Sequence, residues 1–180
     1  MRVIAGSRKG HRLLAPRGLA TRPTSDRVRE SVFDLVGPVD GARVLDLYAG
    51  SGALGIEALS RGAASAVFVE QDPDAVRTIE RNLDRLRLTG ARVVRGDALR
   101  VIAREAAAGA KYDLVLVDPP YGMLTEIQPA LARHLPMLLS AEGLLVVETE
   151  ARVEPELPLP LRTSRRYGQT RVTLFEAAPR

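Results

Sequence analysis

The sequence has no cysteine, no tryptophan and only two histidines among its 180 residues. Without cysteine, thiol catalysis, disulfide bonds and cysteine-ligated zinc or iron–sulfur sites are excluded. His11 and His134 lack partners at metal-ligand spacing, so we expect no metal site. The absence of disulfide chemistry agrees with the cytoplasmic location that we expect.

Long apolar segments and repeats are also missing. No apolar run approaches the roughly 20 residues that a membrane span needs, and the first residues, Met1–Gly6, are too short for the apolar region of a signal peptide. Internal repeats, low-complexity tracts and dividing linkers are absent as well. We therefore expect residues 1–180 to form one domain that is neither secreted nor membrane-bound, with a basic arm or hairpin at 1–22 and a core at 23–180.

Acidic residues are missing from the first 22 positions, although the whole chain carries a net charge of only +4. The basic residues of this stretch are Arg2, Arg8, Lys9, Arg12, Arg17 and Arg22. Such a distribution predicts an arm that contacts phosphates. A solubilising tail or an arginine-biased genome would give the same pattern.

Short apolar runs recur along the chain at intervals too long for hairpins. Runs without alternation are typical of strands buried on both faces of a parallel sheet. Between them lie predicted helices at 74–88, capped by Asp72 with Pro73 at its first position, and at 98–108. The expected strands are 44–47, 66–69, a weaker one at 91–94, 114–117 and 144–148. This alternation predicts a doubly wound α/β sheet.

Both ends of the chain depart from this alternation. Near the C-terminus, the turn at 167–170 lies between a polar stretch and the alternating run 171–176, which predicts an antiparallel hairpin that closes the sheet. Near the N-terminus, segments 2–5 and 11–14 can pair as a small basic hairpin. A capped helix is expected from Thr24 or Ser25, and one of its faces carries Val28, Val32, Leu35 and Val36.

A glycine-rich loop follows the first predicted strand and reads Gly50-x-Gly52-x-x-Gly55. Glycines at this place let a ligand approach the backbone at the start of a helix. An acid about 20 residues further on is expected to bind ribose hydroxyls, and Glu70 satisfies that spacing. The loop therefore predicts a site for a cofactor that contains adenosine.

Asp46 distinguishes between two such cofactors. A carboxylate beside the loop suits the ammonium and sulfonium groups of S-adenosylmethionine, whereas it would repel the pyrophosphate of a nicotinamide dinucleotide. Asp97, with the amide of Ala98, can meet the adenine ring, although Asp97 can equally be a helix N-cap. For Asp46 and Glu70 the alternative is a capped turn or a strand end that faces solvent.

The fourth strand leads into Asp118-Pro119-Pro120-Tyr121, which resembles the motif of amino-directed nucleic acid methyltransferases. An exocyclic amine is a poor nucleophile because its lone pair is delocalised into the base. The Asp118 carboxylate and the Pro119 carbonyl can each accept one amine hydrogen and orient the nitrogen. Pro120 stiffens the turn, and Tyr121 can stack on an extruded base. The motif indicates an amine but not which base; a strand-ending turn is the alternative.

Over nearly its whole length the chain resembles the bacterial small-subunit (16S) rRNA guanine-N2 methyltransferases. The segments that carry the resemblance are 2–6, 22–30, 46–55, 118–121 and 167–170, with Ser25 where threonine is more usual. The resemblance implies a Rossmann-like class I methyltransferase fold with a seven-stranded, mostly parallel sheet. It also implies S-adenosylmethionine as methyl donor, without a metal, and a guanine of the small ribosomal subunit or its assembly intermediate as target.

The expected site follows from the motifs and the resemblance together. For donor binding we expect Asp46, Tyr48, Gly50, Ser51, Gly52, Glu70, Gln71, Asp97 and Ala98; for catalysis Asp118, Pro119, Pro120 and Tyr121; and for RNA binding Arg8, Lys9, Arg12, Arg22 and Arg27. Arg27 with Glu30, and Asp26 with Arg29, can instead form ion pairs on a helix surface. We expect a monomer.

Three other functions stay open from the sequence. A DNA adenine-N6 methyltransferase would share the glycine loop and the Asp118 motif, but such enzymes usually carry an added target-recognition region. A nicotinamide-dependent oxidoreductase would leave Asp46 and Asp118 without a role. A non-catalytic RNA-binding assembly factor would keep the fold without the activity, since fold alone does not establish function.

Overall fold

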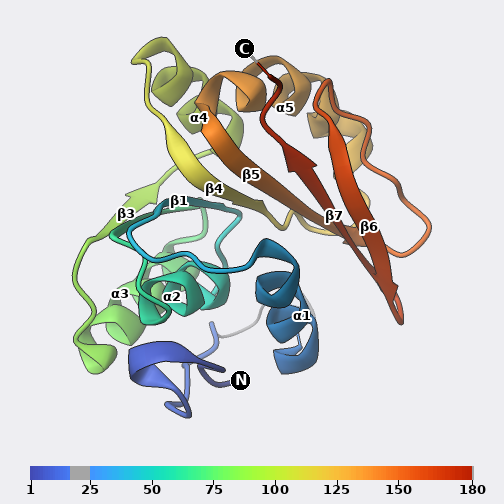
Figure 1. Ribbon diagram of the computed structural model, residues 1–180. Coiled ribbons are helices and arrows are strands. Elements are labelled where there is room, and N and C mark those ends of the chain that lie inside the picture. Colours follow the sequence, from blue (N-terminus) through green and yellow to red (C-terminus); the bar gives the residue numbers. More distant parts are fainter. Residues whose placement is uncertain (17–24, 180) are drawn as a thin grey trace.

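The computed structural model describes residues 1–16 and 25–179, in which one seven-stranded sheet is flanked by helices on both faces (Figure 1). The strand order is β3-β2-β1-β4-β5-β7-β6. Strands β1 to β5 pair in parallel, while β7 is antiparallel to both β5 and β6. The predicted doubly wound sheet with an antiparallel C-terminal hairpin is confirmed.

The strands form where the apolar runs predict them. Their bounds are β1 Arg43–Leu47, β2 Ser65–Glu70, β3 Ala91–Arg95, β4 Tyr112–Val117, β5 Leu139–Glu150, β6 Leu161–Tyr167 and β7 Thr170–Glu176. The residues of β1, β2 and β4 are buried almost throughout, as expected for strands covered on both faces. Strand β5 starts five residues before the predicted strand because it follows the preceding helix without a loop.

Two helical layers cover the sheet (Figure 1). Helices α1 (Asp26–Val36), α2 (Ala53–Ser60) and α3 (Pro73–Leu86) lie on one face, and α4 (Ala98–Ala107) and α5 (Leu124–Leu138) on the other. The central strands supply alternate residues to the two apolar cores, as Val44 and Leu45 of β1 do. No helix in the described part of the chain is both long and apolar enough to cross a bilayer.

Most predicted helix ends agree with the structure. Ser25 caps α1, and Asp72 caps α3 with Pro73 at its first position. Helix α3 ends two residues early because Arg87 adopts a left-handed conformation. Helix α5 is not among the predicted helices; it contains Pro129 and Pro136, which usually indicate a helix end.

The N-terminal segment pairs with itself as predicted, though with little regular structure. Arg2 and Arg12 form a single antiparallel bridge, and the amide of Val3 donates to the carbonyl of His11 at 2.9 Å. The connecting loop contains the short 3-10 helix η1 (Gly6–Arg8). The predicted hairpin therefore has little regular pairing between its two segments, and contacts with the core are needed to hold it in place.

The register of the parallel strands fixes where the site lies. Leu47 of β1 lies level with Val69 of β2 and with Val117 of β4. Glu70 and Asp118 therefore both leave the sheet at its carboxyl edge, where they flank Tyr48. The strand order reverses between β1 and β4, which is where open α/β sheets bind ligands.

Candidate active site

The glycine loop turns sharply from β1 into α2. Gly52 takes a left-handed conformation (φ 78°) at the N-cap of α2, and its amide donates to the carbonyl of Ala49 at 2.7 Å. At Gly55 an added Cβ would lie 2.3 Å from the ring of Phe68 and 2.9 Å from the Asp46 carboxylate. Glycine is therefore required at 55 by close packing between helix and strand, and at 52 by backbone conformation.

Asp46 lies beneath this loop and is only 1% exposed. Its carboxylate accepts a hydrogen bond from the amide of Gly55 at 2.9 Å. Burial, supported by the negative charges of Asp118 and Glu70, raises the pKa of Asp46 to about 7, against the opposing effect of the Gly55 amide. Three carboxylates thus gather at the carboxyl ends of β1, β2 and β4, and their combined field attracts a cation.

Glu70 accepts hydrogen bonds from backbone amides on both of its oxygens. One oxygen accepts from Gly50 of the glycine loop at 2.9 Å, and the other from Gln71 at 2.8 Å and Asp72 at 2.9 Å. The carboxylate therefore bridges the loop after β1 and the loop after β2. Gln71 itself is exposed beside it.

The loop after β3 completes this part of the site. Asp97 is exposed and accepts from the amide of Arg100 at 2.9 Å, so it caps α4, while Ala98 is buried. Burial, together with the nearby charge of Asp97, raises the pKa of Tyr48 to about 12. Tyr48 itself has a positive φ of 60°, an uncommon conformation for a bulky residue. Tyr48 and Asp97 therefore lie close together although 49 positions separate them in the sequence.

The Asp118–Tyr121 loop leaves β4 beside β1. The amide of Asp118 donates to the carbonyl of Leu47 at 3.4 Å, and the side chain of Asp118 is half-buried. Pro119 is buried and Pro120 exposed. Tyr121 is 52% exposed, which leaves part of its ring open to a partner. The predicted catalytic and donor residues therefore meet at one edge of the sheet.

Two contacts that the sequence did not indicate brace this loop. The hydroxyl groups of Tyr121 and Thr170 lie 3.2 Å apart, which connects the loop to the β6–β7 turn. The next amide, of Gly122, donates to the carboxylate of Glu150 at 2.5 Å. Since both partners are more than 25 positions away, no local pattern could have identified them.

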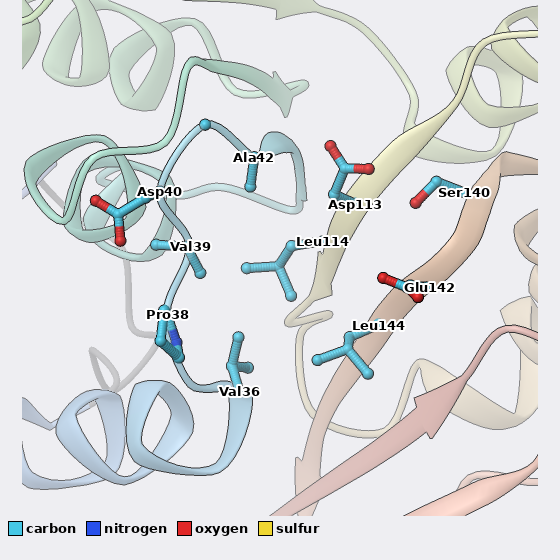
Figure 2. A pocket seen from close by; sticks show the side chains of 11 residues that line it. Val36, Pro38, Val39, Asp40, Ala42, Asp113, Leu114, Ser140, Glu142 and Leu144 are labelled. Carbon is cyan, nitrogen blue, oxygen red and sulfur yellow. The ribbon is translucent and has the colours of Figure 1, made fainter.

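Two hollows in the surface lie elsewhere. One, of about 300 Å³, is formed by the end of α1 and the amino ends of β1, β4 and β5, and Asp40, Asp113 and Glu142 line it (Figure 2). The other, of about 320 Å³, lies between the N-terminal hairpin and α1. None of the predicted donor or catalytic residues lines either one. We place the site at the carboxyl edge because the glycine loop, the three carboxylates and the strand-order reversal coincide there.

The structure brings only some of the predicted RNA-binding residues that it describes together. The Arg8 guanidinium donates to the carbonyls of Leu86 at 2.5 Å and Arg87 at 3.3 Å, which caps the C-terminal end of α3. Lys9 and Arg27 line the hollow between the hairpin and α1, whereas Arg12 is exposed on the hairpin. Arg22 lies outside the described residues.

A buried ionic cluster that the sequence analysis missed holds the N-terminal hairpin. Glu57 of α2 is fully buried and accepts from the amides of Ile4 at 2.8 Å and Ala5 at 2.9 Å. It also pairs with Arg61 at 2.8 Å and with Arg29 at 3.6 Å. The predicted pair of Asp26 and Arg29 forms at 2.9 Å, but Arg29 is fully buried and not on a helix surface. The sign of this cluster in the sequence was Glu57, a single acidic residue within the apolar run 53–60.

Asn82 of α3 makes a second such connection and is 1% exposed. Its side chain accepts from the amide of Leu14 at 2.8 Å and donates to the carbonyl of Leu14 at 3.1 Å. It also donates to the carbonyl of Ser51 in the glycine loop at 3.1 Å. One buried amide group thus connects the N-terminal hairpin with the donor loop.

The described residues contain no group of three or more histidine, aspartate or glutamate side chains placed to hold a metal ion.

Comparisons with known proteins show which family the chain belongs to. The family model described as "Conserved hypothetical protein 95" matches residues 1–176. YlbH of Bacillus subtilis, provisionally named an rRNA methyltransferase, is 42% identical, with 98% of each chain covered. Ribosomal RNA small subunit methyltransferase D of Escherichia coli is 41% identical over 88% of this chain and 78% of its own.

Solved structures show the same architecture. An Escherichia coli protein, provisionally named a methyltransferase, superposes with a TM-score of 0.84 at 36% identity, with 100% of this chain and 99% of that chain covered. A hypothetical protein of Thermus thermophilus gives the same TM-score and identity over 98% of this chain and 99% of its own. The seven-stranded sheet and its C-terminal hairpin are therefore shared with these proteins over their whole length.

Proposed function

The chain belongs to the family described as Conserved hypothetical protein 95, and we propose that it transfers a methyl group from S-adenosylmethionine to the exocyclic N2 of a guanine in small-subunit (16S) rRNA. Its named relatives are rRNA methyltransferases, so the chain is an rRNA methyltransferase that uses S-adenosylmethionine. The observation that supports the proposed site most directly is the cluster of three carboxylates beside the glycine loop.

The residues of the carboxyl edge fit the donor. S-adenosylmethionine carries an ammonium and a sulfonium, and the charged form of Asp46 is destabilised by burial and, to a smaller extent, by two neighbouring carboxylates. A bound cation would relieve that repulsion. Glu70 would exchange its bond to the Gly50 amide for the ribose hydroxyls, while Tyr48, Ser51, Gly52, Gln71, Asp97 and Ala98 would surround the rest of the molecule.

The Asp118–Tyr121 loop would hold the guanine. The carboxylate of Asp118 and the carbonyl of Pro119 each accept one hydrogen of the amine, which directs its lone pair toward the donor's methyl group. When bound, the donor supplies an electrophilic methyl carbon on sulfur. Transfer of that carbon to the amine nitrogen would leave the electron pair of the carbon–sulfur bond on sulfur, and Asp118 would take the proton that the amine loses.

Tyr121 would stack on the extruded base. Stacking on an aromatic side chain contributes about 1 to 3 kcal/mol per base, and the half-exposed ring is held through its hydroxyl by Thr170. We further propose that the chain acts as a cytoplasmic monomer on the small subunit or its assembly intermediate, and that Arg8, Lys9, Arg12, Arg22 and Arg27 add phosphate contacts.

Mass spectrometry of nucleosides tests this function. The protein is incubated with isotopically labelled S-adenosylmethionine and unmodified small subunits, free rRNA or duplex DNA. The variants are Asp118→Ala and, as a matched control, Asp113→Ala, which removes a carboxylate from the opposite end of the same strand. We expect labelled N2-methylguanosine from the wild type and from the control, and a loss of at least 100-fold in Asp118→Ala, on the order of what a positioned acid–base group contributes.

Other products would replace the proposal. Labelled N6-methyladenine in DNA would identify a DNA methyltransferase. Donor binding without transfer to any of the three substrates would identify a binding protein that kept the fold.

A further inference from the structure

The turn between β6 and β7 carries cations that none of the predicted assignments uses. Arg165 and Arg166 lie in β6 just before the turn, and Arg152 follows β5. All three are exposed, and none forms an ion pair with another described residue. By contrast, Arg162 pairs with Glu176 at 3.6 Å and Arg171 with Glu154 at 2.8 Å. We call Arg152, Arg165 and Arg166 the tip arginines.

Backbone pairing places the tip arginines around one turn, with Arg165 and Arg166, as consecutive residues of β6, on opposite faces of the edge strand. The amide of Ala151 donates to the carbonyl of Gln169 at 2.8 Å, so the end of β5 lies against the β6–β7 turn. Arg166 lies directly opposite Arg171. Like charges placed opposite each other on one face of a sheet are unfavourable. Glu154 neutralises Arg171, whereas Arg166 keeps its charge toward solvent.

The same turn holds the catalytic loop. Thr170 begins β7 and contacts the Tyr121 hydroxyl, while Glu150, at the end of β5, accepts from the amide of Gly122. The tip arginines therefore flank the segment that fixes the exposed Tyr121 ring. Figure 1 shows β6 at the edge of the sheet, with the turn at the end of the hairpin away from the C-terminus, where no helix covers it.

Arg8, one of the predicted RNA-binding cations, lies further from this place. Arg8 binds the C-terminal end of α3, and α3 begins at the carboxyl edge with Pro73. Its 14 residues at about 1.5 Å each place that end roughly 20 Å away along the helix. Phosphates next to a base held at Tyr121 are therefore nearer to the tip arginines than to Arg8.

We infer that Arg152, Arg165 and Arg166 bind the RNA phosphates that flank the target nucleotide. The inference rests on the proposed function and adds a second RNA contact to it, separate from the N-terminal hairpin. Exposed charges on an edge strand also discourage pairing between sheets, and the experiment below distinguishes the two roles.

The test is the salt dependence of RNA binding. The variant Arg152→Gln/Arg165→Gln/Arg166→Gln is compared with wild type for binding to labelled, unmodified 16S rRNA between 50 and 300 mM salt, concentrations of about one-third to two-fold physiological ionic strength. Loss of three contacts to the phosphates of single-stranded RNA should make the slope of log K, the binding constant, against log salt concentration shallower by about 2. The KM for small subunits should rise while kcat is largely kept, since these residues do not touch the reacting atoms.

A matched control removes three charges elsewhere. Arg104→Gln/Lys111→Gln/Arg133→Gln changes residues on α4, before β4 and on α5 without altering the carboxyl edge. We expect the wild-type slope from this control. An unchanged slope in the tip variant, with or without increased aggregation, would overturn the inference.

Failure of the proposed function gives a different pattern. Calorimetric binding of S-adenosylhomocysteine should be equal in wild type and in the tip variant. If the wild-type protein binds S-adenosylhomocysteine but neither binds nor methylates the rRNA, the proposed function is contradicted, and the inference with it.

Discussion

Replacement of Glu57 by glutamine removes one charge from the cluster that holds the N-terminal hairpin. The Glu57 carboxylate is fully buried and receives the amides of Ile4 and Ala5 and the guanidinium groups of Arg29 and Arg61. A glutamine has one acceptor oxygen in place of two. In either orientation its NH2 group would face a backbone N–H, and the buried guanidinium of Arg29 would lose a negative partner.

The expected cost follows from these contacts. Breaking a buried ion pair by removal of one partner costs about 3 to 5 kcal/mol. Arg29 keeps Asp26 and the carbonyl of Arg2 as partners, so we expect the lower end, about 3 kcal/mol. In a protein of this size 1 kcal/mol lowers Tm by about 2 to 4 °C, so Tm should fall by about 6 to 12 °C.

Thermal unfolding and amide hydrogen exchange measure this change. The exchange of the Ile4 and Ala5 amides should accelerate more than that of the strand amides, because the hairpin loses its main attachment. Glu80→Gln, on the exposed face of α3, is the matched control and should change stability by less than about 0.5 kcal/mol. A loss below about 1 kcal/mol in Glu57→Gln, with unchanged exchange at residues 4 and 5, would refute the reasoning.

Three further predictions concern the site. Burial raises the pKa of Asp46 to about 7, so the stability contributed by its protonated form is fully present below the ordinary value near 3.8 and is lost as pH rises through about 7. Urea unfolding without donor should show a fall of roughly 2 to 3 kcal/mol between pH 5 and 8, and the fall should disappear in Asp46→Asn. Gly55→Ala places a Cβ against Phe68, so calorimetry should show a free energy of unfolding lower by about 1 to 3 kcal/mol and weaker donor binding. The control is Gly96→Ala, whose added Cβ comes no closer than 3.7 Å to its nearest neighbour and which should leave stability nearly unchanged. Asn82→Ala leaves buried backbone groups unsatisfied and should cost about 2 kcal/mol, with faster exchange in both the hairpin and the glycine loop; an effect confined to the hairpin would contradict the connection.

Local patterns in the sequence determined much of this protein. Apolar runs located the parallel strands because burial on both faces leaves few polar positions in them. Asp72 with Pro73 located the start of α3 because a helix N-terminus has specific chemical needs. The glycine loop and the Asp118–Tyr121 motif could be found for the same reason: each packs its chemistry into a few consecutive residues. The proline-containing α5 lacked such a signal.

Only the tertiary structure decided how distant residues are used. The burial of Glu57 with Arg29, the bond from Tyr121 to Thr170 and the placement of Arg8 on α3 each join segments that the chain order keeps far apart. A charged residue has the same appearance in a sequence whether it binds RNA, caps a helix or holds a buried partner. Which of these it does depends on the elements that pack around it, and that packing is fixed by the order and register of the strands.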